Sequence, residues 1–224
     1  MLLKTARVSF KTILLLVAVI ILNSCSTTAI DEFRQGETGI SSNDKIVVLG
    51  RRADPNYVTS HQFINCIREG MESNEIPISV VDEKEFVKNM GGYFSVRHAP
   101  YSISSFRQRM DNPHFETLIK ESGVRYIVWI DGTTTETDKK ANMSCSITPS
   151  GGGCFGFMTW EDTSDFQTEI WDVNNNSIVG SISTDANGQS YVPALVVPLP
   201  LLAKVESNAC ERLAIQLNRF IHGN

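Results

Sequence analysis

The side chains that could act as metal ligands or acid–base groups are few and scattered. Four histidines, His61, His98, His114 and His222, stand far apart, with no HExxH motif and no pair of cysteines at zinc-binding spacing. A single imidazole without a nearby partner binds metals weakly and catalyses little, so each is interpreted as a surface histidine. The sequence predicts no metal site and no cofactor.

Two short segments match reactive motifs in composition alone. Gly151–Gly156 fits GxGxxG, but a strand is predicted after it, where a pyrophosphate-binding loop needs a helix. Ser42–Lys45 fits SxxK but lacks the companion motifs of penicillin-interacting serines, and the sequence contains no GxSxG. We therefore predict no catalytic residues, and the chain is not expected to be an enzyme.

Asp131 is the carboxylate whose position best suits a ligand site. It follows an apolar strand predicted over Ile127–Ile130, and open α/β sheets bind ligands at the carboxyl ends of their strands. The alternative, an Asp that caps a turn before Gly132, is favoured because no second titratable group has an assignable position beside it. An envelope hydrolase or a small-ligand-binding protein with a site near Asp131 is therefore the alternative function.

The first cysteine closes a segment typical of an export signal. Lys4, Arg7 and Lys11 precede an unbroken apolar run of ten residues, Ile13–Leu22, and Cys25 follows shortly after it. Ten residues at about 1.5 Å each cannot cross a hydrocarbon core of about 30 Å as a helix. Residues 1–24 are therefore predicted to be a cleaved targeting segment.

Residues 22–25 (LNSC) resemble the lipobox of bacterial lipoproteins, with Asn23 a less usual occupant. The resemblance implies a lipid thioether on Cys25, cleavage before it and acylation of the new amino terminus. In this family the residue after the cysteine influences sorting, and a serine such as Ser26, rather than an aspartate, implies delivery of the lipoprotein to the outer membrane. The alternatives are an ordinary secretory signal cut near residues 27–29 and an uncleaved anchor.

The charge of the exported chain makes nucleic acid an unsuitable partner. Residues 1–24 hold three basic and no acidic side chains, so their removal leaves 17 basic and 25 acidic side chains, a net charge of −8. Phosphate binding needs a basic stripe, whereas the densest basic spots, Arg51–Arg52 and Lys139–Lys140, are isolated pairs. The remaining 200 residues suffice for one domain with a substantial core.

Four cysteines remain once Cys25 is acylated, and an even number in an exported chain favours disulfides. Cys145 and Cys154 flank a proline- and glycine-rich segment that can fold back, and this pairing would stabilise the fold by about 3 kcal/mol on the chain-entropy model. The second pair would be Cys66 with Cys210. Both lie on apolar faces of predicted helices, where free cysteines behave as small hydrophobes, so this pairing stays open.

The helices and strands that would position the candidate residues are predicted to come after an N-terminal stalk. Residues 25–43 are rich in Ser, Thr, Gly and charge and are predicted to be a lipidated flexible stalk. Strands are expected at 45–49 and 78–81, joined by a helix over 60–74 with apolar residues on one face. Further helices are predicted at 82–90, 104–110, 113–123 and 203–221, strands at 125–133, 155–160, 165–173 and 178–184, and a hairpin turn at 174–177.

The predicted fold is a single α/β domain over residues 44–224. Its mixed sheet has parallel N-terminal strands, a C-terminal antiparallel hairpin and flanking helices, including a C-terminal helix. The order of KIVVLG, ISVVDEKEF, RYIVWIDG and EIWDVNNNSIVGS resembles the periplasmic domains of the curli-secretion lipoprotein and of lipoprotein activators of penicillin-binding proteins. This resemblance covers most of residues 45–221 and implies assembly or regulation at the envelope, with no catalytic residues to carry over.

Residues 192–203 (VPALVVPLPLLA) form an almost wholly apolar segment with three prolines. The segment is too short for a transmembrane helix, and Pro198 and Pro200 remove amide donors from its middle. It either lies buried over the core, which is favoured, or contacts a protein partner, or dips into the bilayer. The contact residues would be Leu195, Val196, Val197, Leu199 and Leu201.

The anchor signal and the lack of a catalytic pattern together define the expected function. We expect a non-enzymatic lipoprotein, anchored to the outer membrane and facing the periplasm, that acts as a binding or assembly factor. Its expected partners are the lipid bilayer, through the Cys25 acyl anchor, and another envelope protein or a second copy of itself.

Overall fold

A computed structural model describes residues 26–51, 59–148, 151–194 and 204–223. These residues form two compact units. The α/β unit comprises residues 27–135, 163–187 and 205–223, and the strand unit comprises Ser26, 136–162 and 188–204 as far as they are described. In the described part of the chain, no helix is both long and apolar enough to cross a membrane. The prediction of one domain over residues 44–224 stays a prediction.

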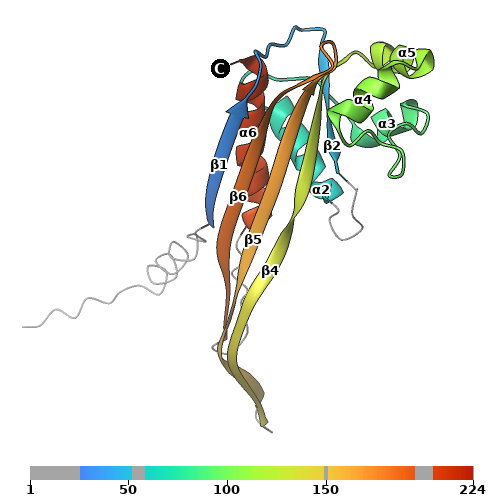
Figure 1. The fold of residues 1–224 in the computed structure, drawn as a ribbon. Coiled ribbons are helices and arrows are strands. Elements are labelled where there is room, and N and C mark those ends of the chain that lie inside the picture. The colour runs from blue at the N-terminus through green and yellow to red at the C-terminus, as the bar shows by residue number, and fades with distance from the viewer. Residues whose placement is uncertain (1–25, 52–58, 149–150, 195–203, 224) are drawn as a thin grey trace, which may run out of the picture. The chain divides into compact units, whose positions relative to one another are not determined.

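The described strands form a mixed sheet in the order β1-β6-β5-β4-β2-β3 (Figure 1). β2 runs parallel to both β3 and β4, and Val47 lies beside Val81 on one edge and Ile127 on the other. β5 and β6 are joined by a turn at residues 173–176, which requires an antiparallel pair. The strands are β1 Ser26–Arg34, β2 Lys45–Gly50, β3 Val80–Val81, β4 Val124–Thr148, β5 Gly151–Asp172 and β6 Ser177–Ala194.

The helices begin and end close to where their capping residues predict. Ser60 accepts a hydrogen bond from the Phe63 amide at the start of α2, and Asp82 accepts two amides at the start of α3. Gly123 ends α5 with a φ of 67°, in the left-handed region that glycine favours. The helices are α2 His61–Glu72, α3 Glu83–Asn89, α4 Ile103–Met110, α5 Pro113–Ser122 and α6 Val205–His222.

Helices cover both faces of the sheet in the α/β unit. Val47 and Leu49 of β2 belong to one buried cluster with aromatic side chains from α3, α4 and α5. On the opposite face, Phe63 of α2 stacks on Phe166 of β5 with ring centroids 3.7 Å apart. α6 lies beside α2 (Figure 1). The predicted fold class, a mixed sheet with parallel N-terminal strands, a C-terminal hairpin and a C-terminal helix, is confirmed.

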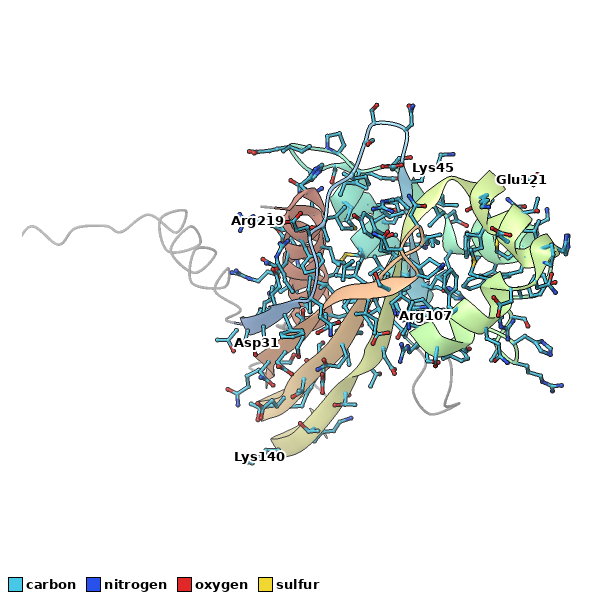
Figure 2. All side chains as sticks on the ribbon, turned by 45° about the horizontal axis from the view of Figure 1, so that its top comes forward. Asp31, Lys45, Arg107, Glu121, Lys140 and Arg219 are labelled. Atoms are coloured by element: carbon cyan, nitrogen blue, oxygen red, sulfur yellow. A yellow bond between two sulfur atoms is a disulfide. The ribbon has the colours of Figure 1, made fainter. Side chains whose placement is uncertain are left out.

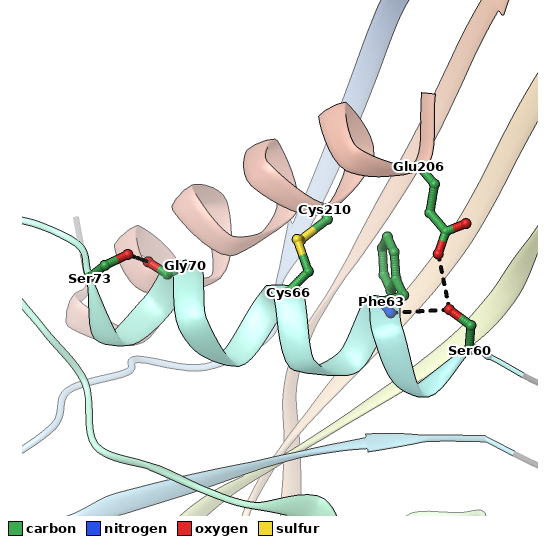
Figure 3. Close-up of a disulfide and its surroundings, with 7 residues drawn as sticks. All are labelled: Ser60, Phe63, Cys66, Gly70, Ser73, Glu206 and Cys210. Atoms are coloured by element: carbon green, nitrogen blue, oxygen red, sulfur yellow. Dashed lines mark hydrogen bonds between the residues drawn. A yellow bond between two sulfur atoms is a disulfide. The ribbon is translucent and has the colours of Figure 1, made fainter. Parts of the chain in front are cut away.

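A disulfide joins α2 to α6 (Figure 3). Cys66 and Cys210 are bonded, with their Cα atoms 6.2 Å apart. Near the start of both helices, the Ser60 hydroxyl donates to the Glu206 carboxylate at 3.0 Å. The two helices therefore run in the same direction, and the pairing that the sequence left open is confirmed. Loop closure over a separation of 144 residues corresponds to about 5 kcal/mol on the chain-entropy model, an upper figure.

The hairpin turn is fixed by a buried ion pair. Asp172 accepts from the Arg125 guanidinium at 2.7 Å and from the Asn175 amide nitrogen at 3.0 Å. Asn176 takes a φ of 49°, as asparagine can in such turns. Arg107 of α4, labelled in Figure 2, donates to the Asn176 carbonyl oxygen at 2.6 Å. The predicted turn is present, one residue earlier than expected.

Of the flexible stalk predicted over residues 25–43, the part from residue 26 to residue 34 is wrong. Residues 26–34 form β1, an edge strand beside β6 whose first side chains alternate between half-buried and exposed. The amides of Gln35 and Gly36 then donate to the Val179 carbonyl oxygen. Edge strands commonly carry charged residues, and this is why the composition suggested a stalk.

The later strands are longer than predicted, and β4 continues through Asp131. No turn follows Asp131, so its interpretation as a turn cap is wrong. Gly132 instead has a φ of 146°, and a Cβ at this position would lie 2.0 Å from the Asp165 carbonyl oxygen. Glycine here allows β4 and β5 to approach closely. The two strands predicted at 155–160 and 165–173 form one, β5.

The strand unit consists of parts of β4, β5 and β6. Lys139 forms an ion pair with Glu136 at 3.0 Å, and Ser190 donates to the Asp162 carboxylate at 2.8 Å. Cys145 and Cys154 lie in β4 and β5, but their side chains fall outside the described residues, so their disulfide stays a prediction. Cys25 and the apolar contact residues Leu195, Val196, Val197, Leu199 and Leu201 also lie outside the described residues.

We expect Gly70→Ala to destabilise the protein although alanine is the better helix former. A Cβ at Gly70 would lie 2.8 Å from the Ala214 Cβ, where α2 meets α6. Overpacking of this kind costs about 1–3 kcal/mol. Urea denaturation measures the loss. The double variant Gly70→Ala/Ala214→Gly removes the contact and should recover most of it; a single variant as stable as the parent would contradict this packing.

Candidate functional site

A cavity of about 440 Å³ opens in the α/β unit where β2 ends. From β2 the chain crosses to β3 on one side and later returns to β4 on the other side. Open α/β sheets bind ligands at such switch points, outside the carboxyl ends of their strands. The volume also falls within the range of about 300–1,000 Å³ that is usual for small-molecule pockets.

The wall of the cavity is mainly hydrocarbon and aromatic. Leu49, Val87, Phe94, Val96, Tyr101 and Trp129 contribute to it. The Trp129 ring packs against Tyr101 and Phe94, with ring centroids 5.4 and 6.2 Å away, and against Trp171 of the core at 5.8 Å. Because these rings also belong to the packed core, the wall is preformed rather than assembled on binding.

Trp129 carries a hydrogen-bond donor that the described residues do not satisfy. The side chain is 3 % exposed, and its Nε1 has no hydrogen-bond partner among the described residues. A buried donor left unpaired costs about 1–3 kcal/mol. Most buried tryptophan nitrogens find a partner, so this residue brings an unpaired donor to the lining of the cavity.

Glu83 fixes the polar end of the cavity. It is 8 % exposed; its Oε1 accepts the Gly50 amide at 3.0 Å, and its Oε2 lies 2.9 Å from His61 Nδ1. An ionised carboxylate only accepts hydrogen bonds, so Nδ1 of His61 is the donor in this pair. Glu83 thus joins the last residue of β2 to the first residue of α2.

Helix caps place both members of this pair. His61 follows the cap Ser60 of α2, and Glu83 follows the cap Asp82 of α3. Each helix begins beyond the carboxyl end of a strand region, so both first residues reach the same edge of the sheet. Lys84 and Lys88 line the cavity from the next turns of α3, on one face of the helix because they are four residues apart.

The sequence analysis missed this pair, and the carboxylate that it considered for a ligand site was Asp131. His61 is half exposed, as a surface histidine would be, but it has a carboxylate partner 22 residues further along the chain. Asp131 is not among the described residues that line the cavity. The available signal was positional: His61 and Glu83 both follow an N-cap residue just beyond the predicted parallel strands.

The other histidines take part in separate local contacts. His98 lies 3.0 Å from the Ser95 hydroxyl, and His222 lies 3.4 Å from the Ile76 carbonyl oxygen. The His114 ring packs near Tyr93. Within the described residues, no three His, Cys, Asp or Glu side chains gather in a way that could hold a metal ion.

Comparisons with known proteins give low similarities. No protein-family model matches the chain, and no curated protein matches it. The solved PelC dodecamer from Paraburkholderia phytofirmans is 11 % identical over 88 % of this chain and 99 % of that chain, with a TM-score of 0.41. A variant of that dodecamer is 13 % identical over 86 % and 96 %, with a TM-score of 0.40. Such values are too low to assign a function.

Replacing Glu83 should destabilise the protein according to how much of its hydrogen bonding is lost. Glu83→Ala leaves the buried Gly50 amide without its acceptor and should lower the free energy of unfolding by about 1–3 kcal/mol. Glu83→Gln keeps a carbonyl oxygen and should cost less. Urea denaturation compares both with Glu85→Ala, an exposed neighbour on α3. Equal stability of Glu83→Ala and Glu85→Ala would contradict the assigned role.

Proposed function

We propose that this protein is a bacterial lipoprotein, held at the outer membrane by acyl chains on Cys25, that acts by binding rather than by catalysis. The observation that supports the anchor is the lipobox-like LNSC sequence, which follows a basic and then an apolar segment. A lipid on Cys25 would also give the bilayer as the first partner. More than one acyl chain makes such attachment stable, because each buried CH₂ adds about 0.8 kcal/mol.

The beginning of β1 at Ser26 bears on how such an anchor would hold the protein. β1 starts one residue after Cys25, and the segment after β1 is fastened to the α/β unit. Arg34 donates to the Phe220 carbonyl oxygen at 3.1 Å, and Gly39 exchanges hydrogen bonds of 3.1 and 2.9 Å with the Tyr126 hydroxyl. A lipid on Cys25 would therefore attach close to a sheet strand, with no long tether between them.

Binding is preferred to catalysis because the carboxylate and the imidazole at the cavity have positioning roles. The Glu83 carboxylate bonds to the Gly50 amide and to His61, and thereby holds the end of β2. The rest of the wall is largely apolar and rigid, which suits recognition. The protein partner is proposed to be another envelope protein or a second copy of this chain, with the apolar segment 195–201 as the contact.

Acylation is tested by metabolic labelling with a clickable fatty acid. The parent chain should carry the label and fractionate with membranes, and Cys25→Ala should lose both properties because the acceptor sulfur is gone. Ser26→Ala is the matched control, since it changes the neighbouring residue and keeps the cysteine. A labelled Cys25→Ala protein would refute the anchor.

The partner contact is tested by crosslinking in intact cells, comparing the parent with Leu199→Asp. A buried charge in an apolar interface is costly, so the variant should lose the crosslinked partner while its circular dichroism and melting temperature stay unchanged. Asn187→Asp, an exposed change outside the segment, is the control. An unfolded Leu199→Asp protein would instead place this segment in the core.

A further inference from the structure

The charged side chains that line the cavity favour an anionic ligand. Among the described lining residues, the acidic side chain is Glu83, and its two oxygens already bond to Gly50 and His61. Lys84 and Lys88 are exposed, and no ion pair joins either ammonium to a described residue. The accessible charge at the cavity is therefore positive, which suits an anion.

The wall requires an apolar body on the same ligand. Trp129, Tyr101 and Phe94 present a preformed aromatic surface, against which a ring can pack edge-on or offset. Trp129 adds a buried N–H without a partner among the described residues. A ligand oxygen that accepts from this nitrogen would satisfy it.

We propose that this cavity binds a small organic carboxylate with a ring-bearing, apolar body. The carboxylate lies at Lys84 and Lys88, the ring packs on Trp129, and an oxygen on the body accepts from the Trp129 indole. Three independent features carry this assignment: the cavity at the switch point, the two exposed ammonium groups on one helix face, and the unsatisfied indole N–H. It holds whether or not Cys25 is acylated.

The chemistry is tested with three probes that share one body. Calorimetry on the full chain in detergent compares 3-(4-methoxyphenyl)propanoate with its amide and with the corresponding amine, after blank titrations into micelles. The acid should bind saturably and about tenfold more tightly than the amide, because its contacts to the lysines are charge-assisted, and the amine should bind most weakly. No saturable binding of the acid, or equal affinities for the acid and the amide, would overturn the proposal.

Two variants locate the site. Lys84→Gln/Lys88→Gln changes exposed side chains only. It should lower the affinity for the acid about tenfold, to the affinity for the amide, and should leave the affinity for the amide unchanged. Lys120→Gln, on α5, is the matched control and should change nothing. An unchanged affinity in the double lysine variant would refute the assigned anion contact.

Trp129→Phe keeps an aromatic ring and removes the N–H. This substitution should weaken the binding of the acid and of the amide by the same factor, since both ligands carry the methoxy oxygen. Unchanged affinity for both would remove the indole from the site. Should Trp129→Phe not fold, the lysine double variant decides alone, because its substitutions are exposed and leave the core intact.

Discussion

Burial of β2 on every side is the constraint on which the α/β unit depends. Ile46, Val47, Val48 and Leu49 are each at most 2 % exposed, and both edges of the strand bond to parallel neighbours. A strand buried on both faces needs a helical layer on each. Right-handed crossovers that leave β2 towards β3, and then return past it to β4, place their helices on opposite faces. α6 completes the layer that α2 begins.

The cavity is a by-product of the same arrangement. β2 ends at Gly50, whereas β4 continues, so the edge of β4 loses its neighbour beyond Ile130. Thr59 partly replaces that neighbour, since its buried hydroxyl donates to the Ile130 carbonyl oxygen at 3.1 Å. Glu83 secures the Gly50 amide at the same point. Satisfying the backbone where one strand stops has thus placed a carboxylate and an imidazole at the rim of an apolar hollow.

Local signals predicted the helices and the central strands well. Ser60, Asp82 and Gly123 act through contacts within a few residues, so the sequence alone places them. Long polar strands were harder to predict. The residues after Asp131 are threonine-rich and charged, and such a stretch extends a strand only because neighbouring strands pair with it. β1 was missed for the same reason, because its charges are compatible with either a solvated linker or a sheet edge.

The candidate site was harder to predict than the fold. The contact between Glu83 and His61 depends on the parallel pairing of β2 and β3. The identity of the two residues does not indicate that pairing. The choice between a free and a bonded Cys66 likewise depended on whether α2 and α6 lie on the same face. By contrast, the unsatisfied nitrogen of Trp129 is a property of packing alone, and no spacing of residue types could have indicated it.

The bond between Cys66 and Cys210 has a consequence for how the molecule is made. If the chain is exported as proposed, it emerges amino end first, so Cys66 would reach an oxidising compartment before Cys145 and Cys154, and Cys210 would arrive last. Oxidation in order of arrival would join consecutive cysteines and trap Cys66 with the wrong partner. Thiol–disulfide exchange must then correct that pairing, or folding must shield Cys66 until α6 arrives. For a chain exported as proposed, formation of this bond would thus depend on completed translocation, and on either disulfide exchange or the shielding of Cys66 until then.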